Sequence, residues 1–264
     1  MKKYLVIGNP IEHSLSPKLH NHWIKENNIK AIYEKKKINE KDIKAIISEI
    51  KNEKIHGINV TIPFKKSVIP FLDELTSLAK EAQSVNTIFK KNKKIIGGNT
   101  DIGGFEKSLK NIDYNVKNKK AFVLGAGGVA PSIILALKKL GVSKIYLSNR
   151  TKEKAKNLSK IHSDIEIVDW GENVDFDIII NTTSLVLKDD DKIRLDFNKN
   201  GSNKLFYDVI YSSGKTNFLI NAEKLGNKTK TGKMMFIYQA QLSFKIWHGV
   251  LPKIDSETVN LLDD

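Results

Sequence analysis

Residues 119–141 read KKAFVLGAGGVAPSIILALKKLG, and this stretch decides the fold of the second half of the chain. An apolar run comes first, a glycine-rich turn follows, and apolar residues at helical spacing then continue as far as Gly141. Gly125, Gly127 and Ala130 match the pattern G-x-G-x-x-[G/A] with a strand before it and a helix after it, the context that makes the pattern informative. Glycines there let the backbone approach a pyrophosphate, and the helix N-terminus offers free amides. The stretch predicts a dinucleotide-binding turn, with an ordinary tight turn as the alternative.

Further strands are predicted on the C-terminal side of this turn. VSKIYLSNR (142–150), FDIIINTTS (176–184) and KLFYDVIY (204–211) are rich in β-branched and aromatic residues, and helical or polar segments separate them. Strands that alternate with helices in this way form a parallel, doubly wound sheet. We therefore expect a Rossmann-type α/β domain over residues 103–234.

The end of the second strand of this domain bears on the choice of cofactor. An NAD site places an acidic residue there to hold the ribose hydroxyls, whereas this chain has Asn149, Arg150 and Thr151. The guanidinium of Arg150 can bind a 2′-phosphate, and Lys152 or Lys154 can add positive charge. The sequence therefore favours NADP over NAD, and a solvated basic loop is the alternative.

The first half of the chain also reads as α/β. Strands are expected at 2–8 and 31–37, and each is followed by a helix. The first helix has Ser16 as its cap and Pro17 at its first position, and the second begins at Asn39. The second helix carries isoleucines on one face at i, i+3, i+4 and i+7, namely Ile43, Ile46, Ile47 and Ile50.

The segment GINVTIPFKK (57–66) predicts a strand that runs into two lysines. Ile58, Val60 and Ile62 alternate with more polar residues, which is typical of a half-buried strand. Lys65 comes just beyond its end, and we expect its neighbour in the sequence, Lys66, to be solvated.

The remaining elements complete an N-terminal domain. A helical stretch is expected over about 65–82, and a hairpin over 85–99 that turns at Lys91 to Lys93. From about Met235 the chain is helical again and can return to the first domain. We therefore expect an α/β substrate-binding domain of residues 1–102 joined by the helices of 235–264.

The composition is that of a globular protein. Apolar residues make up 40% and charged residues 28% of the 264 residues, and no apolar run reaches the length of about eighteen that indicates a membrane helix. The chain has no cysteine, which excludes disulfides and thiol nucleophiles. The start, MKKYLVIGNP, has no small-residue cleavage site and predicts a first strand, not a signal peptide. We therefore expect a cytoplasmic protein.

The formal net charge of +14 would by itself fit a nucleic-acid partner, so a basic nucleic-acid-binding protein is one alternative. The lysines, however, are scattered, and the arginines are limited to Arg150 and Arg194, without interleaved aromatic residues. We expect neither a nucleic-acid partner nor a membrane partner. The six histidines show no ligand spacing, and no metal is expected.

Seven parts of the chain point to one family. They are GNPIEHSLSPKLHN (8–21), GINVTIPFKK (57–66), AQSVNTI (82–88), GGNTDIGGF (97–105), LGAGGVA (124–130), SNRT (148–151) and the Gln239 of YQAQ. In order and spacing they resemble the shikimate dehydrogenases, oxidoreductases of the shikimate pathway that reduce 3-dehydroshikimate with NADPH in aromatic amino-acid and chorismate biosynthesis. The resemblance covers nearly the whole chain.

The resemblance implies roles for particular residues. Lys65 and Asp101 resemble the catalytic pair, and an ammonium beside a ketone can stabilise the charge that develops on oxygen and supply a proton. A structural ion pair is the alternative reading. Ser14 and Ser16 resemble the pair that binds the substrate carboxylate. The remaining substrate contacts that the resemblance implies are Asn59, Thr61, Asn86 and Gln239 for the ring hydroxyls and Tyr211 near the carboxylate.

On the cofactor side the resemblance adds several positions to those read from the motifs. The contacts implied are Gly125, Ala126, Gly127, Gly128, Val129, Asn149, Arg150, Thr151, Lys154, Thr182, Gly232 and Met235. Four positions depart from the family pattern: Val186 and Met234 stand where glycines are usual, and Ser212 and Ser213 follow Tyr211 in place of Asn-Pro.

The resulting expectation is an NADP-dependent enzyme, monomeric or homodimeric, with a small-molecule substrate and a catalytic cleft between two α/β domains. An NAD-dependent quinate/shikimate dehydrogenase and a weakly active shikimate-binding paralogue are the alternatives within the family.

Overall fold

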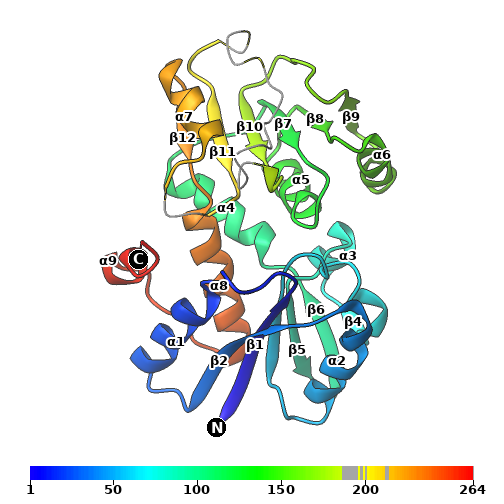
Figure 1. The fold of residues 1–264 in the computed structure, drawn as a ribbon, viewed down its shortest axis with the longest axis vertical. Coiled ribbons are helices and arrows are strands. Elements are labelled where there is room, and N and C mark those ends of the chain that lie inside the picture. Colours follow the sequence, from blue (N-terminus) through cyan, green and yellow to red (C-terminus); the bar gives the residue numbers. More distant parts are fainter. Residues whose placement is uncertain (186–195, 197–198, 200, 212–213, 264) are drawn as a thin grey trace. The chain divides into compact units, whose positions relative to one another are not determined.

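The structure is a computed structural model that describes residues 1–185, 196, 199, 201–211 and 214–263. The chain divides into two compact units (Figure 1). Met1–Gly104 and Ile237–Asp264 form the first unit, and Phe105–Phe236 form the second. The chain passes from one unit to the other within helix α4 (Asp101–Asn111) and again within helix α8 (Lys233–His248).

The first unit is built on a mixed sheet of six described strands in the order β2-β1-β3-β5-β6-β4. Strand β3 pairs antiparallel with β5, and β5 with β6, whereas β1 is parallel to both of its neighbours. The strands are β1 (Lys2–Gly8), β2 (Ala31–Lys37), β3 (Gly57–Val60), β4 (Glu74–Leu75), β5 (Thr87–Lys91) and β6 (Lys94–Gly98). The helices are α1 (Ser16–Glu26), α2 (Ile43–Lys51), α3 (Ser77–Ala82) and α9 (Ser256–Asn260), with 3-10 turns at Glu40–Asp42 and Ile69–Phe71.

The isoleucine face predicted for α2 is confirmed. All four isoleucines of that face are at most 5% exposed and belong to one core cluster with residues of β1 and β3. The helix follows a capping box at its N-terminal end, in which the side chain of Asp42 accepts from the backbone N–H of Asn39 at 2.8 Å.

The strand predicted in the segment 57–66 is confirmed, but the expectation that it is half-buried is wrong. Strand β3 ends at Val60 and is buried along its whole length, while Ile62 is 54% exposed. The reason is that β3 lies between β1 and β5 and is covered on both faces. Ile58 and Val60 pack in the cluster of α2, and an added Cβ at Gly57 would lie 2.4 Å from Trp247 of α8.

A single helical stretch over 65–82 is also wrong. This segment contains turns, the 3-10 turn at Ile69–Phe71, the short strand β4 and only then α3. Pro70, which lacks a backbone N–H and lies in the first turn of that 3-10 helix, does not continue a helix begun upstream. The predicted hairpin is confirmed. Asn92 and Lys93 connect β5 to β6 with φ of 51° and 65°, as a two-residue turn between twisted strands requires.

The second unit contains the parallel, doubly wound sheet expected from the sequence. Its described strands lie in the order β12-β11-β10-β7-β8-β9, and every neighbouring pair is parallel. Successive strands run outward in both directions from β7, so the end of β7 is the switch point at which such sheets bind ligands. The strands are β7 (Lys120–Leu124), β8 (Lys144–Ser148), β9 (Ile165–Val168), β10 (Ile178–Asn181), β11 (Leu205–Asp208) and β12 (Lys228–Lys230). The helices are α5 (Ala130–Lys139), α6 (Lys152–Ile161) and α7 (Asn217–Lys224).

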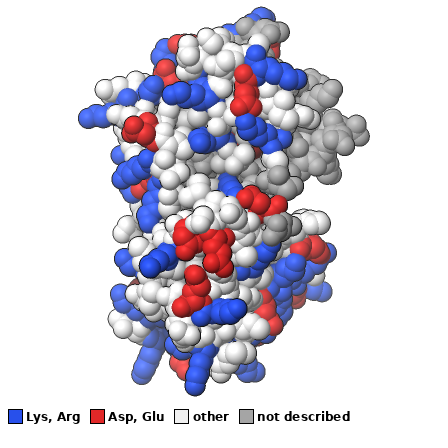
Figure 2. All heavy atoms as spheres, turned by 90° about the vertical axis from the view of Figure 1, so that its left-hand side faces the viewer, with Lys and Arg blue, Asp and Glu red and all other residues white. Residues whose placement is uncertain are grey.

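Charges of both signs are mixed on the face of the molecule that Figure 2 shows, where basic side chains are scattered with acidic side chains among them. Exposed lysines pair with carboxylates at several places, for example Lys37 with Glu12 and Lys144 with Glu166. Within the part of the chain that the structure describes, no helix combines the length and apolarity needed to cross a membrane.

Candidate active site

A buried ion pair lies in the first unit. The Nζ of Lys65 lies 2.6 Å from Oδ2 of Asp101, and the two residues are 8% and 5% exposed. Among the described residues Asp101 is the one side-chain partner recorded for this ammonium, which has three donors. Two N–H groups of Lys65 therefore remain for a ligand. Lys66 is exposed, as expected.

Backbone structure brings the two partners of this pair together. Asp101 is the first residue of α4, where a carboxylate is favoured by the helix dipole. Asn99 supports this helix start by accepting the Ile102 N–H at 3.3 Å and donating to the Ser84 carbonyl at 2.8 Å. The carbonyl of Lys65 in turn accepts the backbone N–H of Val85. The lysine loop and the start of α4 are thus both tied to the segment that precedes β5.

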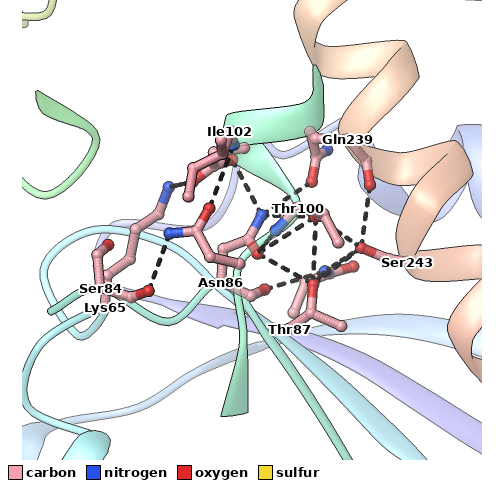
Figure 3. A network of polar contacts seen from close by, with 11 residues as sticks. Lys65, Ser84, Asn86, Thr87, Thr100, Ile102, Gln239 and Ser243 are labelled. Atoms are coloured by element: carbon pink, nitrogen blue, oxygen red, sulfur yellow. Dashed lines mark hydrogen bonds and ion pairs between the residues drawn. The ribbon is translucent and has the colours of Figure 1, made fainter. Parts of the chain in front are cut away.

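Asn86 links the ion pair to a larger buried network (Figure 3). Its Nδ2 donates to Oδ1 of Asp101 at 2.9 Å and approaches Oε1 of Gln239 at 3.3 Å. Its Oδ1 accepts the backbone N–H of Thr100 at 2.7 Å. Asn86 therefore holds Asp101 in the orientation in which the other carboxylate oxygen meets Lys65.

The network continues through three hydroxyl groups to Asn59. The hydroxyl of Ser243 on α8 lies 2.9 Å from that of Thr87 and 3.1 Å from that of Thr100. Nδ2 of Asn59 reaches Ser243 at 3.0 Å, Thr87 at 3.1 Å and the carbonyl of Asn86 at 3.0 Å. The labelled residues of Figure 3 come from the segments that follow β3 and β6, from the start of β5 and the residues before it, and from α4 and α8, and they converge on one region of the first unit.

The two serines near the start of α1 lie close together, but not as expected. The expectation that Ser16 caps the helix is wrong, because Ser16 is its first residue and the N-cap is Leu15, which makes no side-chain capping bond. Instead the hydroxyl of Ser14 accepts the backbone N–H of Ser16 at 3.4 Å. The hydroxyl of Thr61 makes no recorded hydrogen bond to any described residue, so it is available to a ligand.

The glycine-rich turn of the second unit is tightly packed at Gly125 and open at Gly127. Gly125 has a φ of 102°, and an added Cβ would lie 2.7 Å from Thr183 and 2.8 Å from the Oγ1 of Thr182, so glycine is required there by the protein itself. At Gly127 an added Cβ would meet nothing closer than 3.9 Å. Gly127 therefore leaves open space just before helix α5. This helix begins at Ala130 and has no acidic residue in its first turn.

The residues after β8 divide into supporting and exposed groups. Asn149 accepts the Ala126 N–H at 2.9 Å and donates to the Thr151 carbonyl at 2.8 Å, so its amide holds the glycine-rich turn. Arg150 and Lys154 are exposed. Lys152 instead pairs with Asp169 at 2.6 Å.

A second cluster of the same unit surrounds the loop after β11. Asp208 accepts from Asn181 at 3.0 Å, from Thr216 at 2.7 Å and from the backbone N–H of Ile210, and burial raises the pKa of its carboxyl to about 6. An added Cβ at Gly232 would lie 2.2 Å from the Val209 carbonyl oxygen. The loop that carries Tyr211 is therefore packed directly on Gly232.

Of the four positions that depart from the family pattern, the structure describes Met234, which lies near the loop that carries Tyr211. The ring of Tyr211 stacks on Phe236 at 5.8 Å. Met235 is 5% exposed, and Met234 is half-buried. The departures at Val186, Ser212 and Ser213 lie outside the described residues.

These two sets of groups are suited to different ligands. The first unit offers a buried ammonium, the carboxamides of Asn59, Asn86 and Gln239, and several hydroxyls, which suit a small polyhydroxylated molecule. The second offers open space at Gly127 of the glycine-rich turn and an exposed guanidinium, which suit phosphate groups. The free amides expected at the start of α5 are not found there, because the N–H groups of Ala130 and Ser132 bond to the carbonyls of Gly127 and Val129, and Pro131 has none.

Comparison with known proteins agrees with both halves of this description. Residues 6–88 match the family described as the shikimate dehydrogenase substrate binding domain, and residues 106–210 match the family described as shikimate / quinate 5-dehydrogenase. The chain is 60% identical over 262 residues to the shikimate dehydrogenase (NADP(+)) of Pelagibacter ubique (strain HTCC1062), with 99% of each chain covered. The chain belongs to the shikimate dehydrogenase family.

Solved structures of shikimate dehydrogenases share the fold. The crystal structure of the Aquifex aeolicus enzyme matches with a TM-score of 0.91 at 39% identity, covering 99% of this chain and 97% of that one. The Thermus thermophilus enzyme, in complex with NADP(H) and shikimate, matches with a TM-score of 0.90 at 28% identity, covering 99% of this chain and 98% of that one. The expected fold, an N-terminal α/β domain followed by a Rossmann-type domain, is confirmed.

Sequence reasoning missed two members of the buried network of the first unit. Ser243 lies four residues after Gln239 on α8, and its hydroxyl donates to the Gln239 carbonyl at 3.1 Å. That helical spacing was the available signal. Tyr33 lies in β2, and its hydroxyl donates to Oδ1 of Asn59 at 2.7 Å. Nothing in the sequence around Tyr33 distinguishes it from an ordinary core residue.

Proposed function

We propose that this protein catalyses the reversible NADPH-dependent reduction of 3-dehydroshikimate to shikimate. The observation that carries the proposal is the buried pair of Lys65 and Asp101, with Nζ and Oδ2 2.6 Å apart and Asp101 held by Asn86. A buried charge pair with unused donors is costly for stability alone, which favours a role in chemistry.

Lys65 is the proposed proton donor in the direction of reduction. As the C3 carbonyl of the substrate is reduced, negative charge develops on its oxygen, and the Nζ ammonium stabilises that charge and supplies the proton. Asp101 keeps the ammonium oriented and accepts a hydrogen bond from a substrate hydroxyl. In the reverse direction the neutral amine of Lys65 takes the hydroxyl proton.

The other polar residues of the first unit bind and orient the substrate. Ser14 and Ser16 hydrogen-bond its carboxylate, and Tyr211 contributes near the same group. The ring hydroxyls are bound by Asn59, Thr61, Asn86 and Gln239. Because these groups are mostly neutral, they set orientation and specificity, whereas the charge that matters for the chemistry is carried by Lys65 and Asp101.

NADP fits the residues of the second unit. Gly127 leaves the space that a pyrophosphate needs to approach the backbone closely. Ala126, Gly128 and Val129 belong to the same turn. No acidic residue lies between Ser148 and Lys152 to repel a 2′-phosphate, which Arg150 binds with the help of Thr151 and Lys154. When bound, NADPH supplies the hydride. Thr182, Gly232 and Met235 complete the site on the nicotinamide side.

The proposal is tested by following the loss of NADPH absorbance with 3-dehydroshikimate, beside the reverse reaction with shikimate or quinate and with NADP or NAD. Turnover that saturates and is specific to shikimate and NADP supports it. Preference for NAD and quinate identifies a quinate/shikimate dehydrogenase instead. A folded protein that binds shikimate without turnover is the weakly active paralogue, and Met234 is then the first position to revert to glycine.

The same proposal includes a cytoplasmic protein that acts as a monomer or homodimer and binds neither nucleic acid nor membranes. Size-exclusion chromatography with light scattering measures the oligomeric state, and retention on a DNA column at low salt tests the nucleic-acid alternative.

A further inference from the structure

Tyr33 occupies the middle of β2 with its side chain fully enclosed by the first unit. The residue is 2% exposed, and helix α1 holds it in two ways. The side chain of Asn21 donates to the Tyr33 carbonyl at 2.8 Å and accepts the Tyr33 N–H at 2.9 Å. The ring of His20 stacks on the tyrosine ring with centroids 4.2 Å apart and planes 2° from parallel. Backbone and ring are therefore both constrained.

His20 serves this stack as an uncharged ring. It is fully buried, and neither ring nitrogen has a hydrogen-bond partner among the described residues. Burial lowers its pKa to about 3, so the imidazole stays neutral at physiological pH. The stack thus fixes the plane of Tyr33 without bringing a charge next to its hydroxyl.

The hydroxyl of Tyr33 lies next to a residue of the proposed substrate site, at 2.7 Å from Oδ1 of Asn59. Burial raises the pKa of Tyr33 well above its ordinary value, so the hydroxyl keeps its proton. Tyr33 therefore donates to Asn59.

The surroundings of Asn59 determine which atom of its amide faces Tyr33. The carbonyl of Asn86 can only accept a hydrogen bond, and it lies 3.0 Å from the Asn59 amide, so Nδ2 must point to it. Oδ1 then faces Tyr33, which is its one recorded donor among the described residues. The two protons of Nδ2 already have three acceptors. The unused capacity of Asn59 is thus the second lone pair of Oδ1.

We propose that Tyr33 is a positioning residue for substrate binding, whose hydroxyl holds Asn59 so that Oδ1 accepts a hydrogen bond from a substrate hydroxyl. This inference rests on the proposed function, because it takes Asn59 to be a substrate contact. Tyr33 itself does not touch the substrate. Its loss therefore weakens shikimate binding and leaves the proton transfer at Lys65 in place.

The test is Tyr33→Phe, which keeps the ring and its stacking on His20 and removes only the hydroxyl. We expect the Kd of shikimate, measured by calorimetry without cofactor, and the KM for shikimate to rise about fivefold to tenfold, the loss expected for one buried hydrogen bond. We expect kcat and the KM for NADP to change by less than about twofold, because the groups that transfer the proton are untouched.

Tyr207→Phe is the matched control. Tyr207 is also buried, at 1% exposed, and its hydroxyl makes one recorded hydrogen bond, to Ser108 at 2.8 Å in the second unit. Both variants lose a buried hydroxyl and a comparable amount of stability, which urea unfolding measures. Only Tyr33→Phe is expected to change the Kd of shikimate, and an equal change in the control overturns the proposal.

A double-mutant cycle with Asn59→Ala separates this inference from the proposed function. In the Asn59→Ala background, Tyr33→Phe is expected to change the Kd of shikimate by less than about twofold, because there is no amide left to position. If Asn59→Ala alone leaves the Kd unchanged, the assignment of Asn59 as a substrate contact fails, and this inference fails with it. If Asn59→Ala weakens shikimate binding but Tyr33→Phe does not, the positioning role alone is overturned. The same holds if Tyr33→Phe raises the Kd equally with and without Asn59→Ala.

Discussion

Replacing Lys65 by methionine removes the proposed proton donor and breaks a buried ion pair at the same time. The side chains of Lys65 and Asp101 are 10% and 7% exposed, so the carboxylate of Asp101 is left buried with the Asn86 amide as its main remaining partner. Breaking such a pair on one side costs about 3 to 5 kcal/mol of unfolding free energy. Loss of the proton donor is expected to lower kcat by a factor of about one hundred or more.

The two effects are separated by the double variant Lys65→Met with Asp101→Asn. An asparagine keeps a group that accepts from Asn86 but carries no charge, so most of the lost stability is expected to return. Activity is not expected to return, because no proton donor has been restored. The assays are urea unfolding followed by circular dichroism, NADPH absorbance for kcat, and calorimetry for the Kd of shikimate.

The result that would refute this reasoning is a kcat of Lys65→Met within about tenfold of the unmodified protein, since a general acid contributes at least about one hundredfold. If both kcat and stability recover in the double variant, the catalytic role of Lys65 is also refuted, because the pair is then only structural.

Three further predictions concern the second unit. Arg150→Ala is expected to raise the KM for NADPH about tenfold or more and to leave that for NADH little changed; equal effects in steady-state assays contradict a 2′-phosphate contact. Gly125→Ala is expected to lower the unfolding free energy by about 1 to 3 kcal/mol, because φ is 102° and the new Cβ would lie 2.7 Å from Thr183. Gly127→Ala, with open space around the added Cβ, is expected to weaken NADPH binding without that loss, and urea unfolding of both variants checks the difference. Burial raises the pKa of Asp208 from 3.8 to about 6, so its contribution to stability is fully present below about pH 4 and is lost as the pH rises through about 6. Relative to Asp208→Asn, the unfolding free energy is therefore expected to fall by about 3 kcal/mol between pH 4 and pH 7, at about 1.4 kcal/mol per unit of pKa; a pH-independent difference in urea unfolding contradicts this.

Local patterns in the sequence were sufficient where neighbours in the chain decide the structure. The isoleucine face of α2, the two-residue turn of the β5–β6 hairpin and the turn at Gly125 all follow from helical periodicity or from backbone conformation. The same holds for the position of Arg150 just after β8, because a residue that follows a strand in the sequence also lies near its end in the structure.

Local patterns failed where residues distant in the chain decide the structure. Strand β3 alternates like a half-buried strand, but β1 and β5 flank it and side chains of α2 and α8 cover both of its faces. Ser16 looked like a helix cap, yet the helix begins one residue earlier than a cap would allow, and Ser14 accepts its N–H instead.

By itself the sequence determined the α/β class, the glycine-rich turn, the preference for NADP and the membership of the proposed substrate residues in one family pattern. Only the tertiary structure decided how those residues are oriented. Asn59, Asn86 and Asp101 acquire defined hydrogen-bonding directions from Tyr33, Thr100 and Ser243, which come from separate strands and helices. The physical reason is that the direction of a buried amide or carboxylate is set by the donors and acceptors around it, and chain folding, not sequence spacing, brings those groups together.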